Sequence, residues 1–169
     1  MRPLSLNWRF NIDGEWFQYG RKQGINFAET EKLVAPEISL GGNFSYDKNG
    51  EFYSTTTIYG YIKKSNVSES YKTLLALMNS KLLWWYLVNT GTVLANGYFR
   101  FKPNYINPFP IPTFSSDDCI KLEQIVDEIY HIKKVNSKSD TKQLEEQIDR
   151  IFFGLYNLND DEIKRINNI

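Results

Sequence analysis

The stretch that decides the fold is residues 68–89, SESYKTLLALMNSKLLWWYLVN. Ser68 or Ser70 suits the start of a helix there, and Asn89-Thr90-Gly91 suits its end. Asn79-Ser80 in the middle predicts a break or kink, or two shorter helices, because both side chains compete for backbone hydrogen bonds. The apolar residues recur about every 3.6 positions, which predicts one buried helix face, formed by Tyr71, Leu74, Leu75, Met78, Leu82 and Tyr86.

Upstream of this helix the sequence is typical of strands and turns. Residues 31–35 (EKLVA) run into Pro36, which fits poorly in a central strand, so an edge strand or a break is expected there. Asp47-Lys48-Asn49-Gly50 predicts a tight turn, because Asn and Gly tolerate positive φ. A β-branched and aromatic run at 52–59 follows, so we predict a hairpin around this turn.

Downstream, residues 96–105 (NGYFRFKPNY) alternate aromatic with basic or polar side chains, which predicts a strand with one buried and one cationic face. Four prolines between 103 and 112 then predict an extended, non-helical path. Ser115-Ser116-Asp117-Asp118 signals the start of a long amphipathic helix. A short polar connector and a second apolar repeat ending near Gly154 favour an antiparallel helix pair.

These elements predict an α+β chain in two parts. We expect a mixed β-sheet body with a central helix over residues 1–114, followed by a C-terminal antiparallel helix pair over residues 115–169. The body carries 12 Lys and Arg against 8 Asp and Glu, and the helical part carries 8 against 12, so their net charges are +4 and −4. A basic body joined to acidic helices suits a segment that touches a polyanion with one face and protein with another.

The composition is that of a globular chain, with 41% apolar and 24% charged residues. The longest apolar run, Leu82–Val88, is far too short to cross a membrane, and no signal peptide is visible. The single Cys119 excludes an internal disulfide and fits a reducing cytoplasm. Together with the single His131 it cannot supply the roughly four ligands of a structural zinc site.

Asn107-Pro108-Phe109-Pro110 is similar to the Asn-Pro-Pro-aromatic loop with which amino-group DNA methyltransferases grip a flipped base. That loop needs two consecutive prolines to aim the Asn side chain at the target amine. Phe109 separates the two prolines in this chain. We therefore predict a rigid strap between the strands and the helices, and not a catalytic loop.

No other motif indicates catalysis. His131 falls on a Lys-rich predicted helix without a supporting motif for a catalytic triad. Glu162-Ile163-Lys164 matches the acid-x-Lys triplet of metal-dependent nucleases, but a solvated helix face explains it as well. Gly41-Gly42 stands alone and suits a turn better than a cofactor-binding loop. We predict no catalytic, cofactor-binding or metal-binding residues in this chain.

Basic residues cluster in three predicted patches that could contact DNA. Arg and Gln have the bidentate geometry that reads guanine and adenine edges, whereas Lys suits phosphates. Each patch alone is also consistent with an ordinary solvated loop. The predicted DNA-contacting residues are Arg21, Lys22 and Gln23 in the first patch, Lys63 and Lys64 in the second, and Asn96, Tyr98, Arg100 and Lys102 in the third.

Four blocks of sequence carry a family resemblance: EKLVAPEIS (31–39) with NFSYDKNGEFYSTTT (43–57), LLALMNSKLLWWYL (74–87), GYFRFKPNYINPFPIP (97–112) and IDRIFFGLYNLNDDEIKRI (148–166). The third block ends in a Pro-Ile-Pro strap, and the fourth runs through Leu-Tyr-x-Leu to an acidic Glu-Ile helix. Together they resemble the TaqI-like C-terminal specificity domain. That domain is the target-recognition part of adenine-specific DNA methyltransferases and of Type IIG restriction-modification enzymes.

The resemblance implies a sequence-specific DNA recognition module that is not an enzyme by itself, since the sequence shows neither a methyl-donor Gly motif nor the base-gripping loop. The parent enzyme would use S-adenosylmethionine, and Mg if it also cleaves DNA, whereas this part would use no cofactor. The expected partners are double-stranded DNA and the methyltransferase domain of the parent chain, with no membrane involved. The acidic helices would pack on the body or on that domain.

Two rival interpretations stay open. The first is a protein-interaction module with an exposed aromatic surface, since aromatic residues make up 15% of the chain. Its binding would be nearly insensitive to salt, whereas binding through DNA phosphates weakens as salt rises. The second is an enzyme with an unrecognised site, which would need a cleft of perturbed acids or bases.

Overall fold

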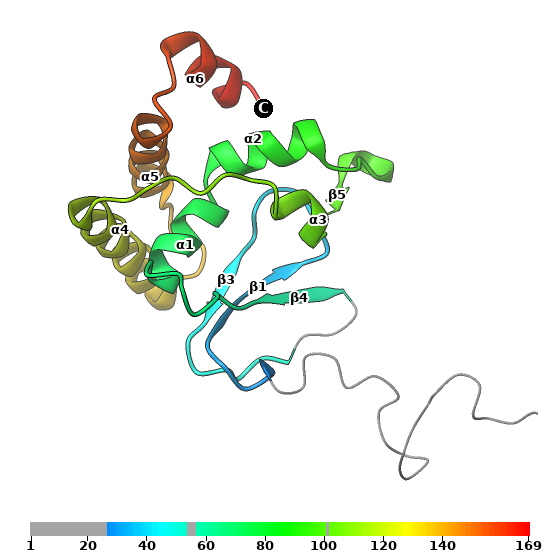
Figure 1. Cartoon of the computed structure of the whole chain (residues 1–169), viewed down its shortest axis with the longest axis vertical. Helices are drawn as coiled ribbons and strands as arrows, with labels where there is room; N and C mark the ends of the chain where they lie inside the picture. The colour runs from blue at the N-terminus through cyan, green and yellow to red at the C-terminus, as the bar shows by residue number, and fades with distance from the viewer. Residues whose placement is uncertain (1–26, 54–56, 101) are drawn as a thin grey trace, which may run out of the picture.

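The computed structural model describes residues 27–53, 57–100 and 102–169, and it confirms the predicted α+β class (Figure 1). In the described residues the strands are β1 (Lys32–Pro36), β2 (Ile38–Ser39), β3 (Ser45–Asp47), β4 (Ile58–Tyr61) and β5 (Phe99–Arg100). The helices are α1 (Tyr71–Met78), α2 (Lys81–Thr90), α3 (Pro103–Ile106), α4 (Ser116–Val135), α5 (Lys142–Leu155) and α6 (Asp160–Asn167), with a short 3-10 turn, η3, at Ala95–Gly97.

The predicted break at Asn79-Ser80 is the boundary between two helices. Ser80 caps the start of α2, where its Oγ accepts a hydrogen bond from the Leu83 backbone N at 3.2 Å. Asn79 ends α1, and its side-chain amide makes two hydrogen bonds with the backbone of Phe44, at 2.9 and 3.0 Å. The break therefore fixes the loop before β3 against the helices.

β1 is the central strand of a three-stranded antiparallel sheet in the order β3-β1-β4. Leu33 pairs with Tyr46 on one side and with Tyr61 on the other. The predicted hairpin around Asp47–Gly50 is therefore wrong for the described residues, because β1 lies between the two strands. Pro36, expected in an edge strand or at a break, is the last residue of β1, so the strand ends there as the second alternative predicts.

A buried ion pair holds the turn that follows β3. Lys32 and Asp47 are 3% and 2% exposed, and Lys32 Nζ lies 2.6 Å from Asp47 Oδ2. The Asp47 carboxylate also accepts hydrogen bonds from the backbone N of Glu51 and of Phe52, at 2.9 and 3.0 Å. Burial alone would raise the pKa of Asp47, but the hydrogen bonds and the ammonium of Lys32 together hold it below its usual value.

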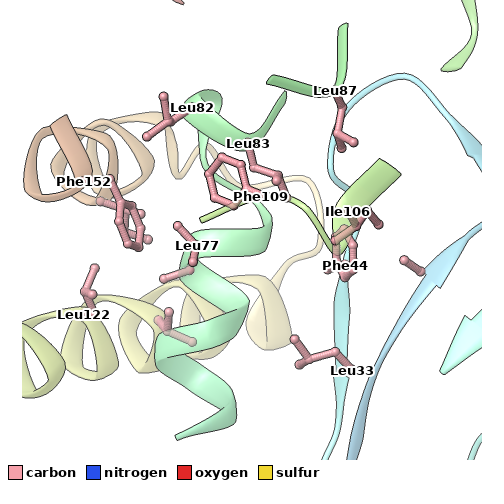
Figure 2. Close-up of a cluster of buried hydrophobic side chains, with 14 of the residues drawn as sticks. Leu33, Phe44, Leu77, Leu82, Leu83, Leu87, Ile106, Phe109, Leu122 and Phe152 are labelled. Atoms are coloured by element: carbon pink, nitrogen blue, oxygen red, sulfur yellow. The ribbon is translucent and has the colours of Figure 1, made fainter. Parts of the chain in front are cut away.

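One hydrophobic core joins the sheet to the helices. α1 packs against the sheet and against α4, while α2 packs against α5 and α6. Figure 2 shows Leu77 of α1, Leu122 of α4 and Phe152 of α5 in this core, and all three are almost completely buried. Leu33 joins them from β1. The helices and the sheet are thus stabilised by the same apolar contacts.

The C-terminal helices begin and end at local signals. Ser115 and Asp118 form a capping box at the start of α4, and Asn159 and Glu162 form another at the start of α6. Asn157 has φ 52° just after α5, in the position where a residue of positive φ commonly ends a helix. A short connector joins α4 to α5, and the two helices form the predicted antiparallel pair (Figure 1).

The proline-rich segment begins as a short helix and a turn, and it has no helix, strand or turn from Pro110 to Ser115. Pro103 begins α3, so the extended path predicted from that residue is wrong, because proline fits the first turn of a helix. Phe109 is 8% exposed, and its ring centre lies 5.0 Å from that of Tyr86 and 5.9 Å from that of Tyr156. Burial raises the pKa of Tyr156 to about 12, and its hydroxyl donates to the Pro110 carbonyl. These contacts tie the segment to the core as a strap.

Candidate nucleic-acid interface

Residues 92–100 form a hairpin beyond the C-terminal end of α2 (Figure 1). The Leu94 backbone N donates to the Tyr98 carbonyl at 2.7 Å, and the Arg100 backbone N donates to the Thr92 carbonyl at 3.3 Å. These hydrogen bonds join the two arms, so the hairpin has a defined register.

The tip of this hairpin explains why the single strand predicted over residues 96–105 is wrong. Asn96 and Gly97 have φ of 64° and 76°, a conformation that reverses the chain and that Asn and Gly adopt at low cost. Among the described residues of that stretch, Phe99–Arg100 forms a strand, β5, and α3 begins at Pro103.

β5 attaches the hairpin to the rest of the molecule. It pairs with β2 in a separate two-stranded sheet, with Ser39 opposite Phe99 and Ile38 opposite Arg100. The Phe99 ring lies edge-on to Trp84, with ring centres 5.2 Å apart. The hairpin is therefore presented from a packed scaffold, as recognition loops commonly are.

Large apolar side chains around this hairpin remain in contact with solvent. Ile38 is 45% exposed and Tyr98 is 41% exposed, and Leu40 and Val93 are exposed still further. An exposed apolar patch of this kind commonly marks an interaction surface. We call Ile38, Leu40, Val93 and Tyr98 the hairpin patch.

Arg100 is held by a carboxylate at the base of the hairpin. Its Nε lies 3.1 Å from Oε1 of Glu37, and the two side chains are 35% and 17% exposed. The Nε atom is buried, and its N–H does not point squarely at that oxygen, so the contact is an ion pair without a well-formed hydrogen bond. Glu37 therefore offsets the charge of Arg100, although the Arg100 side chain still meets solvent.

The structure brings together the predicted contact residues of the third patch. Lys102 lies two positions after Arg100, the last residue of β5, and it is half-buried. Its carbonyl accepts a hydrogen bond from the Tyr105 backbone N at 2.9 Å where α3 begins. The other three members lie on the tip or on the second arm of the hairpin, so the patch is one continuous segment: Asn96, Tyr98, Arg100 and Lys102.

The second patch lies at the other end of the main sheet. Leu33 at the start of β1 pairs with Tyr61 at the end of β4, whereas β2 follows the opposite end of β1. Lys63 Nζ donates to a carbonyl of its own loop at 3.0 Å and lies 5.5 Å from the centre of the Tyr71 ring. Lys64 is exposed. The structure thus separates Lys63 and Lys64 from the hairpin, and Lys63 already has local partners.

The first patch, Arg21, Lys22 and Gln23, lies outside the described residues. Sequence reasoning missed two features of the other surfaces. No local sequence pattern indicates that Glu37 forms an ion pair, because its partner Arg100 is far away in the chain. Phe52 is 62% exposed, although the aromatic run to which it belongs indicates a half-buried strand.

The residues that the sequence analysis weighed for catalysis are exposed or cap a helix. Asn107 is exposed directly after α3, and His131 is exposed on α4. The Glu162 carboxylate accepts a hydrogen bond from the Asn159 backbone N at 2.9 Å and so caps α6.

Within residues 27–53, 57–100 and 102–169, no group of three or more His, Cys, Asp and Glu side chains could hold a metal ion. None of the helices in that part of the chain is long and apolar enough to cross a membrane.

Comparison with known families defines the class of protein. Residues 4–111 match the family model of the TaqI-like C-terminal specificity domain. The match covers more than half of the chain and contains the hairpin, all the described strands and α1 to α3. The chain therefore belongs to the TaqI-like C-terminal specificity domain family, as the sequence resemblance predicts.

The chain is also similar to a curated enzyme of a restriction-modification system. The chain is 29% identical over 119 residues to the Type II restriction enzyme and methyltransferase RM.Eco57I of Escherichia coli. The aligned region covers 68% of this chain and 12% of that relative. The chain thus spans only a small share of the length of an enzyme that restricts and methylates.

Proposed function

We propose that this chain is a sequence-specific DNA recognition module, the target-recognition domain of a restriction-modification adenine methyltransferase, and that it is not catalytic alone. The observation that carries the proposal is the match of residues 4–111 to a specificity-domain family. The similarity to a relative that is a restriction enzyme and methyltransferase supports the enzymatic context.

The hairpin of residues 92–100 supplies the recognition surface in this proposal. A two-stranded β-ribbon fits the major groove of B-DNA, which is about 12 Å wide. Asn96 at the tip, with Tyr98 and Arg100 on the second arm, would reach base edges, and Lys102 would contact a phosphate.

The other predicted patches would add affinity. Lys and Arg contacts with phosphates make binding strong at low salt and weak at high salt. Lys64 is exposed and would contact a phosphate away from the hairpin, with Lys63 beside it. Arg21, Lys22 and Gln23 belong to the same proposed set of DNA contacts.

The chemistry would reside in a methyltransferase domain of the parent chain. That domain would bind S-adenosylmethionine, and Mg if the enzyme cleaves DNA, while this part would need no cofactor. Residues 115–169 carry 8 Lys and Arg against 12 Asp and Glu, so this helical part would face the catalytic domain, because its net negative charge repels a phosphate backbone. A module that recognises cellular DNA would be located in the cytoplasm.

The hairpin patch also favours a second candidate, a protein-interaction module. Exposed Ile38, Leu40, Val93 and Tyr98 provide an apolar and aromatic surface of the kind that protein partners cover. Binding through this surface would change little with salt, whereas DNA binding would fall steeply.

The experiment is selection from a randomised duplex pool with the 169-residue chain, at two salt concentrations, with and without the parent methyltransferase domain added back. Enrichment of one short motif, with weaker binding at the higher salt, supports the proposal. Retention of all sequences alike would overturn the claim of specific recognition, and retention of no duplex at either salt concentration would favour the protein-interaction module.

A further inference from the structure

The ion pair between Glu37 and Arg100 leaves part of the arginine side chain exposed although its Nε atom is buried. Arg100 Nε is buried and faces Oε1 of Glu37 at 3.1 Å, while 35% of the Arg100 side chain is still exposed. The exposed area therefore belongs to the rest of the side chain, which includes the end of the guanidinium group. The Nε edge of the guanidinium thus faces the Glu37 carboxylate, and the exposed part of the side chain lies away from Nε.

The neighbours of Arg100 are apolar and also exposed. Arg100 pairs with Ile38 across the two-stranded sheet, and residues directly opposite in a sheet share a face. Tyr98 lies two residues before Arg100 in extended backbone, so it shares that face as well. Arg100 thus shares one face with two exposed apolar neighbours, Ile38 across the sheet and Tyr98 along its own strand.

We propose that Glu37 is a positioning residue that makes Arg100 a reader of a base edge and not a phosphate anchor. The inference rests on the proposed DNA-recognition function and names the specificity residue within it. A phosphate anchor works by its net positive charge, which displaces counterions. Glu37 cancels that charge locally but leaves the planar donor group oriented, and oriented bidentate donors distinguish guanine from the other bases.

The loop that carries Glu37 is itself fixed. Its backbone N donates to the Thr57 carbonyl at 2.8 Å, which ties the residue to the chain just before β4. Glu37 also lies between β1 and β2, so both neighbouring segments are held in strands. The carboxylate therefore has a defined position from which to orient Arg100.

The experiment measures two quantities for the 169-residue chain: base preference at each position of the selected motif, and the slope of log affinity against log salt. The variants are Arg100→Lys, which keeps the charge and loses the planar fork, and Glu37→Gln, which keeps the shape and loses the charge. Lys64→Ala is the matched control, since Lys64 is an exposed cation at the other end of the main sheet. Thermal unfolding of each variant confirms that the fold is retained.

For Arg100→Lys we expect the preference at one base pair to fall about tenfold or more, with a nearly unchanged salt slope. For Glu37→Gln we expect a loss of preference at the same base pair together with tighter binding to unrelated sequences and a salt slope steeper by about one, because an uncompensated cation now meets the phosphates. A purely structural role of Glu37 would lower all binding and the unfolding temperature, and it would not raise non-specific affinity. Lys64→Ala removes a proposed phosphate contact, so it should weaken binding to all sequences alike and make the salt slope shallower by about one, with the selected motif unchanged.

Two results would overturn the inference while leaving the proposed function intact. One is a motif that survives both Arg100→Lys and Glu37→Gln with its base preferences unaltered. The other is a uniform loss across all sequences in an Arg100→Ala variant, with the salt slope shallower by about one, which identifies a phosphate contact. If the unmodified chain enriches no motif at all, the proposed function and this inference both fail.

Discussion

Lys32–Asp47 and Glu37–Arg100 are both ion pairs that connect a segment at one end of β1 to a distant part of the chain, but they differ in burial. The first pair is almost inaccessible, with Nζ and Oδ2 2.6 Å apart and further hydrogen bonds to the carboxylate from the backbone. The second keeps a third of the arginine side chain in solvent.

The difference in burial separates two uses of the same chemistry. A buried ion pair that loses one partner leaves an uncompensated charge in a medium of low dielectric constant, so its partners depend on each other for folding. A partly exposed pair contributes little to stability, because water and salt screen it. The pair at the start of β1 therefore stabilises the fold, whereas the pair at the far end contributes little to stability and is the one for which we propose a role in recognition.

The largest expected effect is that of Asp47→Ala. The substitution strands the buried Lys32 ammonium and removes the acceptor of two backbone N–H groups, so the free energy of unfolding should fall by about 3–5 kcal/mol. Urea unfolding at neutral pH measures it, and Lys48→Ala, which changes an exposed side chain of the same turn, should stay within about 0.5 kcal/mol of the unmodified chain. A loss below about 1 kcal/mol for Asp47→Ala would show that this end of β1 does not depend on the pair.

The pH dependence of stability should come next in size. The pKa of Asp47 is lower in the folded chain than its usual value of 3.8, so its contribution to stability is present above that value and is lost as the pH falls through the folded pKa. Asp47→Asn cannot titrate. The stability difference between the unmodified chain and this variant should therefore shrink as the pH is lowered below about 4, measured by urea unfolding at a series of pH values. A difference that grows on acidification contradicts the assignment.

The sequence predicts the helices of this molecule much better than its sheets, for a physical reason. The caps of α4 and α6 involve residues three positions apart, Ser115 with Asp118 and Asn159 with Glu162, so the whole signal is local. The order β3-β1-β4 depends on the insertion of β1 between two strands that the turn signal at Asp47–Gly50 predicts to be direct neighbours. Strand pairing is a property of distant residues, and a local pattern does not encode it.

In the candidate site, too, the sequence predicts local features but not contacts between distant residues. Asn96-Gly97 is a reverse-turn signal, but the alternating pattern that follows it favours a strand, and the structure realises the turn. Arg100 on the hairpin and Lys102 just after it are visible in the sequence, whereas Glu37, which offsets the charge of Arg100, is brought to it only by the fold. Sequence reasoning therefore finds the cations and misses what offsets them.

The stability effect of Arg100→Ala should be small, about 1 kcal/mol or less, because the pair with Glu37 is partly exposed and lacks a well-formed hydrogen bond. Urea unfolding of this variant, beside Asp47→Ala in the same buffer, tests the contrast between the two ends of β1. A loss as large as that of Asp47→Ala would mean that Arg100 is a structural residue, and the recognition assignment of this end would lose its basis.

Asp149 adds a buried carboxylate of a third kind. It is 5% exposed on α5, and its Oδ1 accepts a hydrogen bond from the Lys81 backbone N at 2.8 Å, so it caps the start of α2 from another helix. No ion pair within 4.0 Å is found for it among the described residues. Burial raises the pKa of Asp149 above its usual value, which is the opposite direction to Asp47.

The smallest effect is therefore expected for Asp149→Asn. The amide oxygen can still accept from the Lys81 N–H while the cost of burying a charge is removed, so the variant should equal or exceed the unmodified chain in stability at neutral pH, by less than about 1 kcal/mol. Asp149→Ala, which has no acceptor, should lose about 1 kcal/mol. The folded pKa of Asp149 is raised, so the contribution of its neutral form to folding stability is present at low pH and is lost as the pH rises through that pKa. The stability difference between Asp149→Asn and the unmodified chain should therefore narrow on acidification. Equal losses for Asn and Ala at neutral pH would show that the negative charge itself stabilises the start of α2, and the contrast with Asp47, whose charge is matched by Lys32, would then disappear.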